Sequence, residues 1–502
     1  MQLEDKDLIS IQETRILLKN AKEAQIKLAQ MTQSEIDFIC EAIKDAAMQN
    51  LERLARLANE ETGFGVAEDK IIKNYFASQV VYDSMKDMKT VGIVSADEAK
   101  KTYEVAVPVG VVAALIPSTN PTSTVIYKAL ISIKAANSIV FSPHPTAKNC
   151  IIEAVRVIKE AAIAAGMPAD CIGCATEITL EGTNELLKNK NTSLILATGG
   201  EPMVKAAYSS GNPAIGVGPG NGPAFIEKSA DIARAVKQII DSKTFDNGVI
   251  CASEQSIIIE KESEQAVIKE LEKQGCYLLT PQEKKLLEKI MLTPKMTMNP
   301  RIVGKTALYI AEMAGIKVPE KTKILIGMET KVGHNIPFSR EKLCPILAFY
   351  IEDTWTDACE RAIEILTKEG AGHTMIIHSN NEEIIKEFAL KKPVSRLLVN
   401  TPGALGGVGA TTNLLPAFTL GCGAIGGSAT SDNISPLNLL NMRRVAYGVR
   451  ELDEIRNSVE DDCKNSTTEN NLRKNELERA VDNKLESVTD LIFEKLRNQL
   501  NI

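Results

Sequence analysis

The sequence predicts an α/β fold built from parallel βαβ units and arranged in two or three domains. Short β-branched runs at residues 105–116, 138–141 and 193–197 are each followed by a Gly, Pro or Ser turn and then by a helical pattern. The same alternation resumes after Phe245. Strands that alternate with helices in this way pair in parallel, and 502 residues suffice for more than one such core.

Each segment adds to this prediction in turn. Apolar residues recur at helical spacing from Leu17 to Leu28 and from Ile36 to Leu54, so amphipathic helices open the fold. The runs between 105 and 197 predict a first sheet, with crossover helices over 124–136 and 150–164 and a further helix over 201–207. A second sheet is predicted from the strand candidates 255–259, 348–351, 374–378 and 396–399.

The chain changes character after residue 455. Residues 456–471 are rich in Asn, Ser, Asp, Glu and Thr, with Val459 as their only aliphatic residue, which predicts a flexible linker. Apolar residues then recur at steps of three or four from Leu477 to Leu500, which predicts an amphipathic helix beyond the folded body. The apolar face of such a helix must be covered by a groove on a partner, by the folded body of its own chain, or by copies of the helix in a coiled coil.

Composition and charge exclude several classes of protein. The chain is 44% hydrophobic and 25% charged with a formal net charge of -7, and it has no basic cluster for nucleic acid. Its apolar stretches are far shorter than the roughly 20 residues of a spanning helix, and its first ten residues lack the pattern of a secretory signal. Ten scattered cysteines fit a reducing compartment. We therefore expect a cytoplasmic globular enzyme.

Cys251 has the most chemical content. It follows the Gly-containing turn 245–248 and precedes an apolar strand, a setting that can expose a thiol. A thiolate that attacks an aldehyde gives a thiohemiacetal, and loss of hydride to a nicotinamide turns that into a thioester. The alternative for any one of ten cysteines is a buried core thiol.

A series of motifs between residues 35 and 450 favours a nucleophilic Cys251 over a buried core thiol. They are Val109-Gly110-Val111-Val112, Pro117-Ser118-Thr119-Asn120-Pro121, Ser142-Pro143-His144-Pro145, Thr198-Gly199-Gly200, the segment 245–254, Glu341-Lys342-Leu343-Cys344-Pro345, Gly372-His373-Thr374 and Thr419-Leu420-Gly421-Cys422-Gly423. In this order the sequence resembles the aldehyde dehydrogenase superfamily. Within it, the sequence resembles the coenzyme-A-acylating enzymes, which include the propionaldehyde and acetaldehyde dehydrogenases of bacterial microcompartments.

The resemblance implies an aldehyde dehydrogenase-like α/β fold, with a Rossmann-type cofactor domain, an α/β catalytic domain and a small β oligomerisation arm. The expected parts are an N-terminal helical extension (1–34), the cofactor-binding domain (35–243, with 91–106 in the arm), the catalytic domain (244–425), a return to the cofactor domain and oligomerisation region (426–455), the flexible linker (456–475) and an amphipathic tail (476–502).

The resemblance also assigns roles to residues. Asn120 donates its amide to the oxygen of the tetrahedral intermediate, with the Cys251 N–H as second donor, although Asn120 could also cap the following helix. Glu341 accepts hydrogen bonds from the nicotinamide ribose; the alternative is a solvated loop glutamate. The predicted cofactor-binding residues are Pro117, Ser118, Thr119, Ser142, His144, Pro145, Thr198, Gly199, Gly200, Gly216, Gly218, Glu341 and Leu343.

Two departures from the hydrolytic members of the superfamily are informative. Those enzymes have a general-base glutamate in a Glu-Leu-Gly-Gly-Lys motif, where this sequence has the acid-free segment Gly216–Pro223. A thioester that water does not cleave must pass to another nucleophile, and the thiol of coenzyme A fits. The residues that usually hold the adenosine ribose are also replaced, around Ser142–Pro145. This is expected if coenzyme A and NAD occupy overlapping sites in turn.

Two further candidates are weaker. His373, in Gly-His-Thr, is a pattern of the acylating branch and could assist deprotonation of coenzyme A, although a lone histidine is more often structural. Cys171 and Cys174 have the spacing of half a zinc site without a second pair, so we predict no metal.

The sequence therefore predicts an NAD-dependent, coenzyme-A-acylating aldehyde dehydrogenase. Propionaldehyde is the leading substrate, followed by acetaldehyde and succinic semialdehyde. The alternatives are a hydrolytic aldehyde dehydrogenase and an inert scaffold. We expect a homodimer or homotetramer. The tail resembles the encapsulation peptides that dock enzymes to microcompartment shell proteins, which places the enzyme in the lumen, and the N-terminal helix at 8–29 is a competing targeting element.

Overall fold

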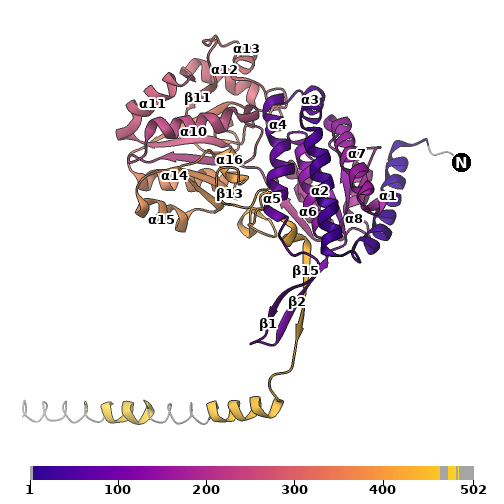
Figure 1. The fold of residues 1–502 in the computed structure, drawn as a ribbon. Coiled ribbons are helices and arrows are strands. Elements are labelled where there is room, and N and C mark those ends of the chain that lie inside the picture. Colours follow the sequence, from indigo (N-terminus) through magenta and orange to yellow (C-terminus); the bar gives the residue numbers. More distant parts are fainter. Residues whose placement is uncertain (1–3, 464–472, 482–483, 485–502) are drawn as a thin grey trace, which may run out of the picture. The chain divides into compact units, whose positions relative to one another are not determined.

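The structure, a computed structural model, describes residues 4–463, 473–481 and 484 (Figure 1). Two parallel sheets form its framework, one after the other along the chain. Within the described residues no helix is both long and apolar enough to cross a bilayer.

The first sheet has five parallel strands in the order β5-β4-β3-β6-β7. Its order reverses at β3, since β4 lies on one side of it and β6 on the other. Open α/β sheets bind ligands outside the carboxyl ends of their strands at such a point. The strands are β3 (Val111–Leu115), β4 (Ser138–Ser142), β5 (Ile172–Cys174), β6 (Leu194–Thr198) and β7 (Ala214–Val217).

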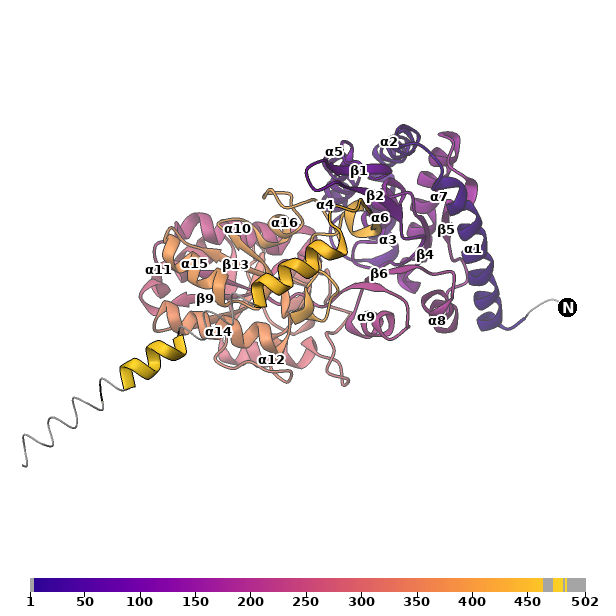
Figure 2. The ribbon, with the colours of Figure 1, turned by 90° about the horizontal axis from the view of Figure 1, so that it is seen from below.

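Helices cover both faces of this sheet. One face packs against α2 (Gln33–Gln49), α6 (Pro121–Lys134) and α7 (Lys148–Ala164), and the other against α1 (Lys6–Leu28), α8 (Leu180–Lys188) and α9 (Glu201–Tyr208). Figure 2 shows α1 along the edge of the sheet beside β4 and β5. The apolar residues Leu18, Ala21 and Leu28 of α1 are fully buried, so the apolar face of this helix is already occupied within the fold.

Three shorter helices complete the first half of the chain: α3 (Leu51–Thr62), α4 (Ala67–Tyr75) and α5 (Val81–Met85). Helix α4 approaches both α6 and the turn that follows α10 (Ile232–Thr244). Two lysines on the buried side of α4 become important at the site below.

The second sheet has seven parallel strands in the order β10-β11-β12-β9-β8-β13-β14. They are β8 (Gly222–Ile226), β9 (Glu254–Glu260), β10 (Cys276–Leu278), β11 (Ile324–Met328), β12 (Ile346–Glu352), β13 (Gly372–His378) and β14 (Val394–Val399). The helices that cover it are α10 and α11 (Glu264–Lys273) on one face, and α12 (Pro281–Met291), α13 (Ala307–Met313), α14 (Trp355–Lys368) and α15 (Glu382–Lys391) on the other. A short helix, α16 (Gly403–Gly407), follows β14.

The structure differs from the sequence expectation at two places in these sheets. The run 105–116 is divided between two strands, because Gly110 has φ +127° and a Cβ there would lie 2.4 Å from the Ser193 hydroxyl. The second sheet also begins at β8, before the boundary expected at residue 244. The short apolar run of β8 directly follows the glycine-rich turn, and its pairing with β9 and β13 is not visible in local sequence.

A small sheet has the order β1-β2-β15, formed by β1 (Gly92–Asp97), β2 (Thr102–Pro108) and β15 (Leu440–Ala446). Its β1–β2 hairpin, residues 92–108, overlaps the span 91–106 that we assigned to an oligomerisation arm. Contacts divide the chain into a larger unit, with residues up to 94 and 105–443, and a smaller unit, with residues 95–104 and those described from 444 onward.

Within the smaller unit, Arg444 Nε donates to Glu104 Oε1 at 3.1 Å. Residues 452–463 and 473–481 are helical, so the flexible linker predicted for 456–475 is replaced by helix at both of its ends. Leu452, Ile455 and Val459 recur at helical spacing, which the polar composition of the segment obscured. Of the predicted amphipathic tail, residues 482–483 and 485–502 lie outside the described residues.

Candidate active site

Two turns meet at the point where the order of the first sheet reverses. Strand β3 leads into Pro117–Asn120, and its neighbour β6 leads into Thr198–Gly200. A cavity of about 240 Å³, here called the reaction cavity, opens at this place. The predicted site residues that line it are Cys251, Asn120, Pro117, Ser118, Thr119, His144, Thr198, Gly199, Gly200, Gly218, Glu341 and Leu343.

Cys251 reaches this cavity because the turn before it has an unusual backbone. Asp246 (φ 50°) and Asn247 (φ 51°) lie in the left-handed region, which Asp and Asn adopt more readily than most residues. Asp246 Oδ1 accepts a hydrogen bond from the Val66 N–H at 2.7 Å, and Asn247 Nδ2 donates to the Gly304 carbonyl at 3.0 Å. These contacts fix the turn and leave Cys251 half-buried at the cavity wall.

The Cys251 thiol is protonated at neutral pH. Burial, together with the neighbouring Glu341 and Cys422, raises its pKa to about 12, and Arg396 opposes the rise. The thiolate is the nucleophilic form of cysteine, so the reaction needs a group that takes up this proton.

A glycine-rich loop, residues 218–221, forms another wall of the cavity. A Cβ at Gly220 would lie 1.8 Å from the Cys251 carbonyl oxygen, so only glycine permits this approach of the two backbones. A Cβ at Gly218 would have no heavy atom within 4 Å, because this residue borders open space. Asn221 anchors the loop by donating from Nδ2 to the Ser339 carbonyl at 2.8 Å.

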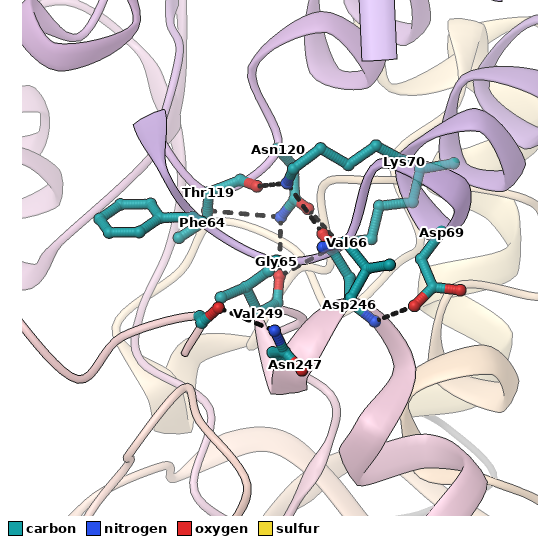
Figure 3. A network of polar contacts seen from close by, with 12 residues as sticks. Phe64, Gly65, Val66, Asp69, Lys70, Thr119, Asn120, Asp246, Asn247 and Val249 are labelled. Atoms are coloured by element: carbon teal, nitrogen blue, oxygen red, sulfur yellow. Dashed lines mark hydrogen bonds and ion pairs between the residues drawn. The ribbon is translucent and has the colours of Figure 1, made fainter. Parts of the chain in front are cut away.

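Asn120 lies at the centre of a polar network (Figure 3). Its Nδ2 donates to the Val249 carbonyl at 3.2 Å and approaches the Thr119 hydroxyl at 3.4 Å. Its Oδ1 accepts from Lys73 Nζ at 2.6 Å, and Lys73 also donates to Asp246 Oδ2. The turn after β3 and the turn before Cys251 are therefore joined through side chains. No side-chain cap bond links Asn120 to α6, which begins at the next residue.

Glu341 is the only carboxylic side chain among the described residues that line the reaction cavity. Its Oε1 accepts a hydrogen bond from the Gly220 N–H at 2.9 Å, so it is not a freely solvated loop residue. Burial raises its pKa to about 8, and the nearby Glu369 adds to the rise. This shift favours the protonated form of the Glu341 carboxyl.

An adjoining cavity of about 380 Å³ extends the site along the sheet. The two cavities share Pro117, His144, Thr198, Gly199 and Gly200, and the adjoining one adds the predicted residues Ser142 and Pro145.

This wall fits a dinucleotide phosphate. A Cβ at Gly199 or Gly200 would meet its nearest heavy atom only at 4.0 Å or 3.8 Å, so backbone is open to the cavity. The turn also precedes α9, whose N-terminal N–H groups favour an anion.

Gly216 and His373 lie outside both cavities. A Cβ at Gly216 would lie 2.6 Å from Val204 Cγ1, so packing of α9 explains this glycine. His373 is fully buried, its Nδ1 lies 2.9 Å from the Thr374 hydroxyl, and its Nε2 has no partner within the described part of the chain. Burial lowers its pKa to about 3, with Arg396 contributing, so its ring is neutral at pH 7.

Sequence reasoning missed two groups of residues at the site. The first is the lysine–aspartate network behind Asn120, because α4 is distant from the site in sequence. The second is an apolar part of the cavity wall formed by Val408, Phe418 and Leu420, although Leu420 belongs to a motif that we singled out. These residues belong to no named strand, so hydrophobic periodicity gave no signal for them.

The profile described as "Aldehyde dehydrogenase family" matches residues 8–334. Among curated proteins, the chain is 45% identical over 442 residues to the bifunctional aldehyde-alcohol dehydrogenase AdhE of Escherichia coli, covering 87% of this chain and 50% of AdhE. The chain thus spans about half the length of that relative.

Solved structures agree with the fold. A probable aldehyde dehydrogenase from Listeria monocytogenes is 64% identical, with a TM-score of 0.89 and coverage of 90% of this chain and 100% of that one. An acetylating aldehyde dehydrogenase from Geobacillus thermoglucosidasius is 53% identical, with a TM-score of 0.88 and coverage of 90% and 99%. These matches confirm the aldehyde dehydrogenase-like α/β fold predicted from the sequence.

Two propionaldehyde dehydrogenases are more distant. One, from the fucose utilisation microcompartment of Clostridium phytofermentans, is 30% identical, with a TM-score of 0.79 and coverage of 87% and 97%. The other, from Rhodopseudomonas palustris, was solved with bound CoA and an acylated cysteine. It is 28% identical, with a TM-score of 0.78 and coverage of 86% and 97%.

Proposed function

The chain belongs to the aldehyde dehydrogenase family, and we propose that it is a coenzyme-A-acylating member that oxidises a short aliphatic aldehyde with NAD⁺ through a thioester on Cys251. The description of the Geobacillus relative as acetylating supports the reaction type. The acylated cysteine and CoA in the Rhodopseudomonas relative support the covalent route.

The observation that supports thiolysis most directly is that the loop 218–221, which approaches Cys251, has no acidic or basic side chain that could activate water. The loop 218–221 contributes glycine and proline to the cavity wall, and the Glu341 carboxyl has a pKa raised to about 8 by burial. A protonated carboxyl does not abstract a proton from water, so hydrolysis of the thioester is slow. The thioester persists until a thiol arrives.

The protein's own groups have separate tasks. Cys251 Sγ attacks the aldehyde carbon, and the Asn120 amide with the Cys251 N–H stabilises the resulting oxyanion. When bound, NAD⁺ accepts a hydride and coenzyme A supplies the thiol that takes the acyl group. The backbone at Thr198–Gly200 holds phosphate, and Glu341 orients the nicotinamide ribose.

The cavity wall also bears on the substrate. Val408, Phe418 and Leu420 suit a short aliphatic chain, with propionaldehyde first and acetaldehyde second. No lysine or arginine is among the described lining residues. Succinic semialdehyde, whose second carboxylate needs a cation, is therefore third.

The deciding experiment is NADH formation over an aldehyde series, with and without coenzyme A. We expect NADH beyond one turnover only with coenzyme A, and acyl-CoA as the product. Multiple turnovers without coenzyme A, with release of free acid, would establish a hydrolytic enzyme instead. Cys251→Ala should abolish turnover while NAD⁺ binding is retained; an inert scaffold would show no turnover even in the unmodified chain.

For His373 we propose a role in accepting the proton of the coenzyme A thiol. Its unpartnered Nε2 supports the role, whereas its full burial outside both cavities and its lowered pKa support the structural alternative. His373→Asn should slow acyl transfer while the first turnover of NADH keeps its rate. An equal loss in both steps would indicate a structural role.

We also propose that the C-terminal tail docks the enzyme to a microcompartment shell protein and that the enzyme forms a homodimer or homotetramer. Among the described tail residues, Leu477 and Val481 are 71% and 52% exposed, which leaves two apolar side chains one helical turn apart available to a partner. Deletion of residues 470–502 should abolish co-purification with shells and leave activity unchanged. Sedimentation of the full chain and the deletion variant would test the oligomer.

A further inference from the structure

Lys73 lies behind Asn120 in a buried position. It is on α4, is 3% exposed, and its Nζ donates to Asn120 Oδ1 at 2.6 Å. An ammonium group only donates hydrogen bonds, so the atom of Asn120 that faces it must be the carbonyl oxygen. The orientation of the Asn120 amide therefore follows from the hydrogen-bonding capacity of Lys73 as well as from the structure.

This orientation decides what Asn120 presents to the reaction cavity. With Oδ1 on Lys73, Nδ2 is directed toward the Val249 carbonyl at 3.2 Å and the Thr119 hydroxyl at 3.4 Å. The second contact is longer than an ordinary N–H···O bond, so that N–H remains available to an oxyanion. A flipped amide would place a carbonyl oxygen there, which repels an oxyanion.

Asp246 fixes Lys73 in this position. Its carboxylate is fully buried and accepts from Lys73 and, at 3.0 Å, from Lys70. Asp246 belongs to the turn before Cys251, so one carboxylate links the oxyanion donor to the nucleophile's own segment. The charge of Lys73 also polarises the Asn120 amide, which strengthens its N–H as a donor.

We infer that Lys73 is a positioning residue for the oxyanion site, which holds the Asn120 amide so that an N–H of Nδ2, and not the carbonyl oxygen, is available to the oxygen of the carbonyl group attacked by Cys251. This inference rests on the proposed function. It adds a residue far from the recognised motifs, and it makes the catalytic contribution of Asn120 depend on a second side chain.

Lys70 provides a matched control on the same helix. It is also 3% exposed and also bonds Asp246, but its other contact is the backbone carbonyl of Thr119 at 3.2 Å. Loss of Lys70 therefore removes a similar buried charge without releasing the Asn120 amide.

The test is a double-mutant cycle on kcat for NADH formation with propionaldehyde and coenzyme A, using Lys73→Met, Lys70→Met and Asn120→Ala in the full chain. Asn120→Ala should lower kcat by about 10²–10³. Lys73→Met should lower kcat by about 10² with little change in the KM for NAD⁺, and should add no more than about twofold in the Asn120→Ala background. Lys70→Met should have a small effect that multiplies with Asn120→Ala.

The inference fails if Lys73→Met keeps the kcat of the unmodified chain, or if its effect multiplies fully with that of Asn120→Ala. Lys73→Gln keeps a donor and should retain a kcat above that of Lys73→Met; a kcat at or below it would also refute the role. If Lys73→Met does not fold, Lys73→Gln takes its place in the cycle under the same criteria. Failure of the proposed function is distinct, because the unmodified chain would then show no coenzyme-A-dependent NADH.

Discussion

Gly220→Ala is a perturbation whose size can be worked out from the backbone. The added Cβ would lie 1.8 Å from the Cys251 carbonyl oxygen, whereas real Cβ contacts stay beyond about 3.0 Å, so the two segments must separate by about 1.2 Å. Neither segment moves freely, because Asn221 and Asp246 anchor them through buried hydrogen bonds. A misplacement of about 1 Å at a reacting centre can cost about 10²-fold in rate.

We therefore expect Gly220→Ala to lower kcat by about 10² while the protein stays folded. Gly173→Ala in β5 is the matched control, since its Cβ would meet Leu17 Cδ2 at 3.4 Å, an ordinary contact, and Gly173 lines neither cavity. The assays are coenzyme-A-dependent NADH formation, iodoacetamide labelling of Cys251 and thermal unfolding. A Gly220→Ala enzyme with kcat within twofold of the Gly173→Ala control would refute the reasoning.

Three further outcomes are expected. The rate of Cys251 alkylation by iodoacetamide should rise about tenfold per pH unit from pH 7 to 10, because burial raises the thiol pKa to about 12; a plateau below pH 9 would contradict this. Asp246→Asn should lower the free energy of unfolding by about 3–5 kcal/mol, because Lys70 and Lys73 lose their buried counter-charge. Asp241→Asn, which breaks the exposed pair with Lys237, should lower it by less than about 1 kcal/mol. Because the two cavities share a wall, NADH should inhibit competitively against coenzyme A, and simultaneous binding in calorimetry would disprove the overlap.

Local patterns predicted those parts of the fold in which one segment determines its own structure. The helix expected over 150–164 is α7 (Lys148–Ala164), and the strand expected over 374–378 lies within β13 (Gly372–His378). Strand β8 was missed because five residues after a glycine-rich turn have no period of their own. Its assignment depends on its pairing with β9 and β13, which only the assembled sheet supplies.

The candidate site also divides into residues that local sequence predicts and residues that only the assembled fold brings together. Asn120, Cys251 and Glu341 stand in recognisable motifs, and the structure brings all three to one cavity. Lys73 has no such motif: it is 47 residues from Asn120 and 173 residues from Asp246 in sequence, on a helix whose pattern indicates only amphipathicity. The residues proposed to contact the reacting groups follow from local sequence, but the residues proposed to orient them follow only from packing.

The order of the first sheet explains why a single cavity can serve both halves of the proposed reaction. The turns after the neighbouring strands β3 and β6 lie at the reversal point, and they line one cavity with Cys251. The turn at Thr198–Gly200 offers backbone that suits phosphate, and the turn at Pro117–Asn120 contributes Asn120. The close approach of Gly220 to Cys251 leaves no room for a side chain at this position of the loop. The loop beside the nucleophile therefore offers only backbone, and Glu341, the one carboxyl among the described lining residues, has a raised pKa, so both features favour the proposed transfer of the acyl group to a thiol over its loss to water.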